Sequence, residues 1–199
     1  MRFLAALALL TLASCATTQT TPAVQTWQEV VTPDDRIRLR DWRTAFTRAL
    51  AQARAANHAV EIESEGVLLD PDAAIGGPIP NGDYRCRVIK VGAKSQGLLE
   101  YVSYPGFRCR IEQGKVQNFT KLTGSQRHVG RIYPADQLHQ VLLGTLVLGD
   151  ETQAYQYGRD PDRDVAGWVE RIGDNRWRIV LPYPHYESLL DVIELVPEQ

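Results

Sequence analysis

Apolar residues recur along this chain with two different periods, and the period changes near residue 84. Over residues 39–53 they recur at steps of three and four, which places them on one face of a helix. A threonine, a proline and two aspartates in front of this stretch suit a capped helix N-terminus. The pattern predicts one helix over residues 32–57. An irregular segment rich in turn residues follows over 60–83, and its part from Gly76 to Asp83 is a candidate lid.

From residue 84 onward, apolar and polar residues alternate in short runs, which is the period of half-buried strands. The predicted strands cover residues 84–91, 98–104, 106–112, 115–122, 126–133, 140–148, 153–157, 165–172, 176–181 and 190–196. Turn sequences such as Gly173-Asp174-Asn175 separate several of them. The pattern therefore predicts a mainly β protein with an N-terminal α-helix. Its strands, about eight to ten in number, would form an antiparallel up-and-down β-barrel over 84–199, which leaves no exposed sheet edge.

The first residues have a different pattern. Arg2 precedes an apolar run from Phe3 to Leu12, which is too short to cross a bilayer, where about 20 residues are needed. Such a run suits the core of a signal peptide. It ends in Leu12-Ala13-Ser14-Cys15, which resembles the bacterial lipobox, whose cysteine accepts a lipid. We therefore expect a lipoprotein signal peptide over residues 1–14 and lipidation at Cys15.

Residues 15–26 combine the lipidated cysteine with a stretch of threonine, glutamine and alanine. Such a composition buries too little apolar surface to offset its ordering entropy, so a flexible tether is expected. In bacterial lipoproteins, an alanine after the cysteine, here Ala16, implies sorting to the outer membrane. The resemblance thus implies a protein of the cell envelope that faces the periplasm and is held to the membrane by its lipid, with palmitate among the acyl chains.

The rest of the chain, residues 27–199, has the size and composition of a single globular domain. Apolar residues make up 44% of the sequence, which is enough for an ordinary core. The formal net charge is −2, and no basic excess favours a nucleic-acid partner. No sequence pattern indicates a cofactor.

With Cys15 assigned to the lipid, Cys86 and Cys109 form an even pair in an oxidising compartment. Each stands between two arginines, in Arg85-Cys86-Arg87 and Arg108-Cys109-Arg110. Alternate residues of a strand share a face, so both cysteines lie on an aromatic and aliphatic face with the arginines opposite. This predicts a structural disulfide between neighbouring strands. The alternative is a redox or metal pair, although neither cysteine is part of a C-x-x-C motif.

The chain resembles two groups of known proteins. The lipobox, the tryptophan-containing helix and the final segments Trp177–Pro182 and Leu190–Leu195 resemble a family of uncharacterised alphaproteobacterial lipoproteins, a domain of unknown function. That family implies no activity. The run of strands is similar to small lipocalin-like barrels, which include ligand carriers and protease inhibitors. This second likeness is one of architecture, and a fold does not determine a function.

Two groups of charged residues are candidate binding sites. Arg85, Arg87, Arg108 and Arg110 would form a basic patch on the outer face of the barrel if their strands are neighbours, suited to phosphate or carboxylate groups. Glu100 and Glu112 would instead neutralise them across the strands.

The second group is Asp160, Asp162 and Asp164, which have the spacing of the first ligands of a calcium loop. Val165 replaces the turn glycine and Arg171 replaces the bidentate glutamate, so an EF-hand is excluded. A weaker calcium site and an Asp–Arg surface network stay open.

No catalytic constellation or metal motif is found. The four histidines lack metal-ligand spacing, and His185, Ser188 and Asp191 are too close in sequence to suggest a triad. We therefore expect a non-catalytic, lipid-anchored barrel that binds a small apolar ligand or an envelope component. One alternative is an inhibitor or interaction module that acts on an envelope protein through a loop or the arginines. Another is an unrecognised hydrolase, which would depend on Asp160–Asp164 and His185.

Overall fold

The computed structural model describes residues 25–198. The predicted signal peptide, the lipidated Cys15 and most of the tether lie outside these residues. Within the described part, no helix is long and apolar enough to cross a bilayer.

Eight antiparallel strands close into a barrel, which confirms the predicted fold class. The strands are β1 (Gly82–Ala93), β2 (Tyr101–Ser103), β3 (Phe107–Glu112), β4 (Gln117–Lys121), β5 (Gln126–Pro134), β6 (His139–Leu148), β7 (Asp164–Gly173), β8 (Arg176–Pro182) and β9 (Ser188–Pro197). Consecutive strands from β3 to β9 are hydrogen-bonded neighbours, and β1 joins β3 to β9. Strand β2 stands outside the ring and pairs only with the second half of β1.

One predicted strand is absent. Residues 153–157, with the sequence Gln-Ala-Tyr-Gln-Tyr, form an irregular loop. Only Tyr157 in this stretch is substantially covered, and its hydroxyl donates to Asp35 Oδ2 on a helix at 2.6 Å. The ring of Tyr155 lies under the guanidinium of Arg163 in the same loop. The two tyrosines thus contact α2 and the loop itself, and the segment pairs with no strand.

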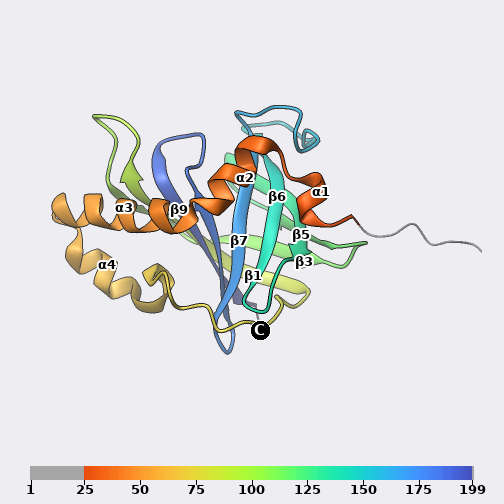
Figure 1. Ribbon diagram of the computed structural model, residues 1–199, viewed down its shortest axis with the longest axis horizontal. Coiled ribbons are helices and arrows are strands. Elements are labelled where there is room, and N and C mark those ends of the chain that lie inside the picture. Colours follow the sequence, from red (N-terminus) through yellow and green to blue (C-terminus); the bar gives the residue numbers. More distant parts are fainter. Residues whose placement is uncertain (1–24, 199) are drawn as a thin grey trace, which may run out of the picture.

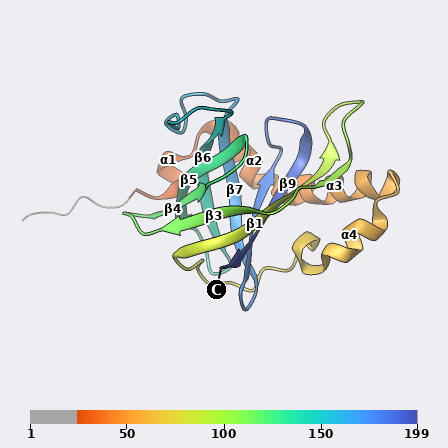
Figure 2. The same cartoon turned by 180° about the vertical axis from the view of Figure 1, so that it is seen from behind.

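Four α-helices and one 3₁₀ helix cover part of the barrel wall (Figure 1). They are α1 (Trp27–Val30), α2 (Pro33–Arg40), α3 (Trp42–Ala55), α4 (Ala59–Glu65) and η1 (Gly66–Leu69). Seen from behind, β3 and β4 have no helix in front of them (Figure 2). The helices thus cover one side of the ring, mainly over β7, β8, β9 and β1.

The prediction of a single helix over residues 32–57 was wrong, because the helix breaks at Asp41. Leu39 packs with α1 and the outer face of β6, whereas Phe46 packs on the outer faces of β1, β8 and β9. A straight helix of this length would run past the curved wall. The break lets each half bury its own apolar side chains against a different part of the barrel.

The segment over 60–83 is only partly irregular, since α4 and η1 occupy it as far as Leu69. Ile62, Leu68 and Leu69 of these short helices are buried in the cluster beneath α3. Helices this short gain their stability from packing rather than from local propensity, which explains why the sequence pattern did not reveal them.

The candidate lid at Gly76–Asp83 closes one end of the barrel as a fixed plug. Ile79 is 1% exposed and belongs to the apolar cluster of the interior. Its N–H donates to Gln140 Oε1 at 3.0 Å, and its carbonyl accepts from Gln117 Nε2 at 2.7 Å. The hydroxyl of Tyr84 donates to the Pro80 carbonyl at 2.7 Å. We call residues 76–83 the plug and the opposite end of the barrel the mouth.

Most of the barrel interior is filled by side chains. Inward-facing residues from every strand of the ring form one apolar cluster, including Phe119, Ile132, Leu142, Trp177 and Ile193. Strands β8 and β9 are buried on both faces, because the helices cover their outer side. Gly92 on β1 permits the closest approach of α3, since a Cβ there would lie 2.9 Å from Ala49 Cα.

Arg178 anchors η1 to the wall of the barrel. Its guanidinium and the carboxylate of Glu170 are both fully buried, and Arg178 Nε donates to Glu170 Oε2 at 2.7 Å. Arg178 Nη1 also donates to three backbone carbonyls in and next to η1, those of Val67, Leu68 and Asp70. Burial of a charge is costly unless the charge is paired and hydrogen-bonded. Here Arg178 Nε and Nη1 supply these contacts, whereas Glu170 Oε1 has no hydrogen-bond partner among the described residues and lies 3.5 Å from His139 Nε2.

Replacement of Arg178 by methionine should destabilise the protein strongly. Glu170 would be left as a buried charge without its partner, and three carbonyls would lose their donor. We expect a loss of about 3–5 kcal/mol in the free energy of unfolding, measured by urea denaturation. The matched control is Arg48→Met, an exposed arginine of α3, which should change this free energy by less than about 0.5 kcal/mol. Equal effects of the two substitutions would contradict the anchoring role.

Candidate functional site

The inward-facing side chains are apolar through most of the barrel, but several are ionisable in the last layer before the mouth. On β1, the apolar series of Tyr84, Cys86 and Val88 ends in Lys90. On β9, the series of Leu195 and Ile193 ends in Asp191. The same change occurs on β4, where Phe119 is followed by Lys121, and on β5, where Ile132 is followed by Gly130 and His128.

The other half of this layer is apolar. Leu146 of β6, Val165 of β7 and Leu181 of β8 line the same small cavity as Lys90, His128 and Asp191. The registers agree with this grouping, since His128 is paired with Leu146 and Leu181 with Asp191. The mouth therefore has ionisable side chains on one side and apolar side chains on the other.

A cleft opens beside this layer because the barrel wall parts at β1. Strand β1 pairs with β3 only over Gly82–Cys86 and with β2 over Ile89–Val91. The β1–β2 hairpin leans away from the ring toward α3 (Figure 1). The cleft next to this parting has a volume of about 490 Å³ and is lined by Val88, Lys90, Tyr104, Pro105, Phe107, Lys121, Gln126, His128, Glu187 and Asp191, among others.

Inside the mouth, Lys90 and Asp191 form a buried ion pair across the seam between β1 and β9. Lys90 Nζ donates to Asp191 Oδ2 at 2.9 Å and lies 3.3 Å from Glu187 Oε2. The Ser188 hydroxyl donates to the other oxygen of Asp191. Burial opposes the charge of Lys90, but Asp191 and Glu187 outweigh it and raise the pKa of Lys90. The ammonium group of Lys90 is therefore protonated, and its charge is balanced by Asp191 and Glu187.

Lys121 and His128 differ from Lys90 because they lack such partners. Lys121 has no ion-pair partner within residues 25–198, and its Nζ lies 4.1 Å from the centre of the Phe107 ring. Burial, together with the charge of Lys90, lowers the pKa of Lys121 to about 8. The residue His128 is 6% exposed, and its buried Nδ1 meets no hydrogen-bond partner among the described residues.

A second, smaller cavity lies beside the cleft and shares part of its lining. Its volume is about 20 Å³, which is room for one water-sized group. Lys90, Gln126, His128 and Asp191 line both spaces. Polar groups of several strands thus converge where the open cleft meets the filled core.

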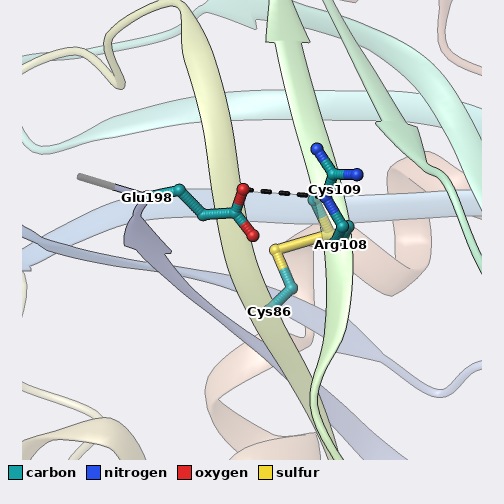
Figure 3. The surroundings of a disulfide bond; sticks show 4 residues. All are labelled: Cys86, Arg108, Cys109 and Glu198. Atoms are coloured by element: carbon teal, nitrogen blue, oxygen red, sulfur yellow. Dashed lines mark ion pairs between the residues drawn. A yellow bond between two sulfur atoms is a disulfide. The ribbon is translucent and has the colours of Figure 1, made fainter.

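The predicted cysteine pair is brought together by the fold. Cys86 of β1 and Cys109 of β3 form a disulfide with a Cα–Cα separation of 6.0 Å, and both side chains belong to the interior cluster (Figure 3). The bridge ties β1 to β3 on the plug side of the cleft, before β1 changes its partner to β2.

The four candidate arginines lie on the outer face of β1 and β3, where Arg85 is paired directly with Arg108. Three of them are engaged by acidic residues other than the expected Glu100 and Glu112. Arg87 pairs with Glu65 and Glu194, Arg110 with Asp83, and Arg108 with Asp83 and Glu198. Figure 3 shows Arg108 turned toward Glu198, at 3.6 Å. The face is a network of alternating charges rather than a basic patch.

The three candidate aspartates are not brought together. Asp164 is buried and accepts the Gly158 N–H at 2.9 Å, whereas Asp160 contacts Arg163 at 3.3 Å and Asp162 contacts His185 at 3.5 Å. Within residues 25–198, no group of three or more His, Cys, Asp or Glu side chains is arranged to hold a metal ion.

The residues of the mouth were not predicted from the sequence. The sequence singles out Asp191 only through its closeness to His185 and Ser188, and it does not single out Lys90 or Lys121. A usable signal existed: Lys90, Lys121 and Asp191 each interrupt an alternating apolar row near one end of a strand, the C-terminal end for β1 and β4 and the N-terminal end for β9. These residues can be recognised as one site only when the strand order is known, because they come from different strands.

One family model matches the sequence over almost the whole described part of the chain. The model of the domain of unknown function DUF4893 matches residues 27–195. The chain belongs to the DUF4893 family. No curated protein and no solved structure matches the chain. The function of this DUF4893 domain must therefore be inferred from its own site.

The buried histidine predicts a specific acid sensitivity. Burial, together with Lys121 and Lys90, lowers the pKa of His128 to about 3. The unfolded chain binds a proton at this imidazole near pH 6.5, while the folded protein does not, so stability falls as the pH drops from about 6.5 toward 3. From pH 7 to pH 5, wild type should lose about 2 kcal/mol more free energy of unfolding than His128→Gln.

Urea denaturation at a series of pH values measures this difference. Burial raises the pKa of Asp191, which contributes in the opposite direction, but both proteins carry that residue. The matched control is His185→Gln at an exposed position, which should follow wild type. Parallel pH profiles for wild type and His128→Gln would show that the buried imidazole titrates normally.

Proposed function

We propose that this DUF4893 protein is a non-catalytic binding module that takes a small ligand at the mouth of its barrel. The observation that carries the proposal is the convergence of Lys121 and the unpartnered His128 on a cleft of about 490 Å³. Small-molecule sites are concave, largely apolar and fitted with a few polar groups, and the mouths of β-barrels are common places for them.

The filled interior supports a ligand at the mouth rather than deep in the barrel. The apolar cluster occupies the space between the plug and Lys90, and the smaller cavity, of about 20 Å³, has room for one water-sized group. A ligand must therefore lie mainly in the cleft, against Tyr104, Pro105 and Phe107.

We also propose that the protein is anchored through a lipid on Cys15 and faces the periplasm from the outer membrane. The support is the sequence Leu12-Ala13-Ser14-Cys15 after a short apolar run. The described residues begin at Gln25, so the proposed lipidation site lies outside them.

Binding at the cleft can be tested with N-phenyl-1-naphthylamine, a neutral dye that fluoresces in apolar sites. The protein lacking residues 1–15 can be used for this measurement, because deletion of these residues removes none of the contacts described above. We expect saturable binding that Tyr104→Ala weakens by about tenfold, since this tyrosine forms part of the apolar wall. Tyr155→Ala is the matched control: Tyr155 is 47% exposed, compared with 41% for Tyr104, and lies outside the cleft. Absence of dye binding, or equal loss in both variants, would count against the site.

The anchor is tested in a bacterial host that processes lipoproteins. Labelled palmitate should be incorporated into the wild-type protein and sediment with the membrane fraction. Cys15→Ser should lose the label and the sedimentation, because acylation needs the thiol. Incorporation of label into Cys15→Ser at the wild-type level would contradict lipidation at this position.

A further inference from the structure

Among the residues 25–198 that line the cleft, the charges leave one cation available to a ligand. Lys90 contacts both Asp191 and Glu187 and is neutralised by them. Arg38, which lines the smaller cavity of about 20 Å³, is paired with Asp35 and also donates to the Asp164 carbonyl. Lys121 lacks an acidic partner within residues 25–198. A ligand with a single negative charge would complete this balance, whereas a dianion would also face the carboxylates of Asp191 and Glu187.

A second donor stands beside this cation. Thr120 of β4 is paired with Val129 of β5, so Lys121 and His128 follow one step further along the same antiparallel pair. A neutral imidazole has one N–H, and neither ring nitrogen of His128 is hydrogen-bonded in the described part of the chain; because Nδ1 is buried, the donor open to a ligand is the N–H of the Nε2 tautomer. An ammonium and an imidazole N–H can each donate to one oxygen of a carboxylate.

The remaining wall of the cleft is apolar and aromatic. Val88, Tyr104, Pro105 and Phe107 line it, and Tyr104 is 41% exposed. Burial of such surface favours a ligand with an apolar body. The volume of about 490 Å³ lies within the usual range for small-molecule sites, roughly 300–1,000 Å³.

We propose that the ligand of this cleft is a small amphipathic carboxylate, whose acid group lies between Lys121 and His128 and whose apolar body lies against Tyr104 and Phe107. This inference rests on the proposed function and specifies the chemical class that the mouth selects. Lys121 supplies the charge, and His128 fixes the orientation of the acid group.

Selection by charge makes binding dependent on pH. Lys121 is faced by Lys90 from β1, by Arg127 and His128 from β5, and by Asp191 and Glu187 from β9 and the loop before it. Burial and Lys90 lower the pKa of Lys121 to about 8. Only the protonated amine pairs with a carboxylate, so affinity should fall as the pH rises above this value.

The test compares decanoate with decan-1-ol, which share a chain length and differ in the head group. Isothermal titration calorimetry at pH 7 should show decanoate binding about tenfold or more tightly than the alcohol. Lys121→Met should abolish this preference. Lys115→Met, which removes an exposed lysine from the β3–β4 turn, should retain it. Decyl phosphate should bind no more tightly than decanoate.

Lys121→Arg provides the pH test, because arginine keeps its charge. Between pH 7 and pH 10, wild type should lose about tenfold in affinity for decanoate, while Lys121→Arg should change little. Equal binding of decanoate and decan-1-ol to wild type, a retained preference in Lys121→Met, or tighter binding of decyl phosphate would overturn the inference. Those results leave the proposed function intact if the neutral dye still binds, whereas loss of all binding would refute both.

Discussion

The pairing of β1 with β9 is the constraint on which the rest of the structure depends. Tyr84 to Ala93 lie antiparallel to Ser188 to Pro197, so two segments about a hundred residues apart close the ring. The inward side chains of this seam supply the buried pair of Lys90 and Asp191. Its outward side chains form the apolar surface on which α3 rests. One run of backbone hydrogen bonds therefore fixes both the mouth and the helical cover.

The other layers of the barrel interior are packed with apolar side chains, whereas one half of the mouth layer is charged. Apolar residues at Lys90 and Asp191 would avoid the desolvation of two charges, and such replacements are often neutral or stabilising in buried ion pairs. This departure from apolar packing is confined to one end of the interior, next to the place where β1 leaves its neighbour β3. Places where a fold gives up its best packing are expected at functional sites. The fixed plug at the opposite end keeps the apolar packing, with Ile79 completing the core.

The sequence predicted the barrel because alternation with a period of two is a local signal. Nine of the ten expected strands are present, and the exception at 153–157 pairs with no neighbouring strand. The break at Asp41 and the helix α4 were missed because both depend on the shape of the wall beneath them. The disulfide was predicted from the matching surroundings of two cysteines. The mouth was not, because Lys90, Lys121, His128 and Asp191 become neighbours only once the strand order and the closing seam are known.

The plug sets a condition on any traffic through the barrel. With Ile79 held by Gln117 and Gln140, a molecule in the cleft has no second exit through the core. Under the proposed function, a ligand would enter and leave on the mouth side of the plug. The barrel would then hold its ligand at one end rather than conduct it from one end to the other.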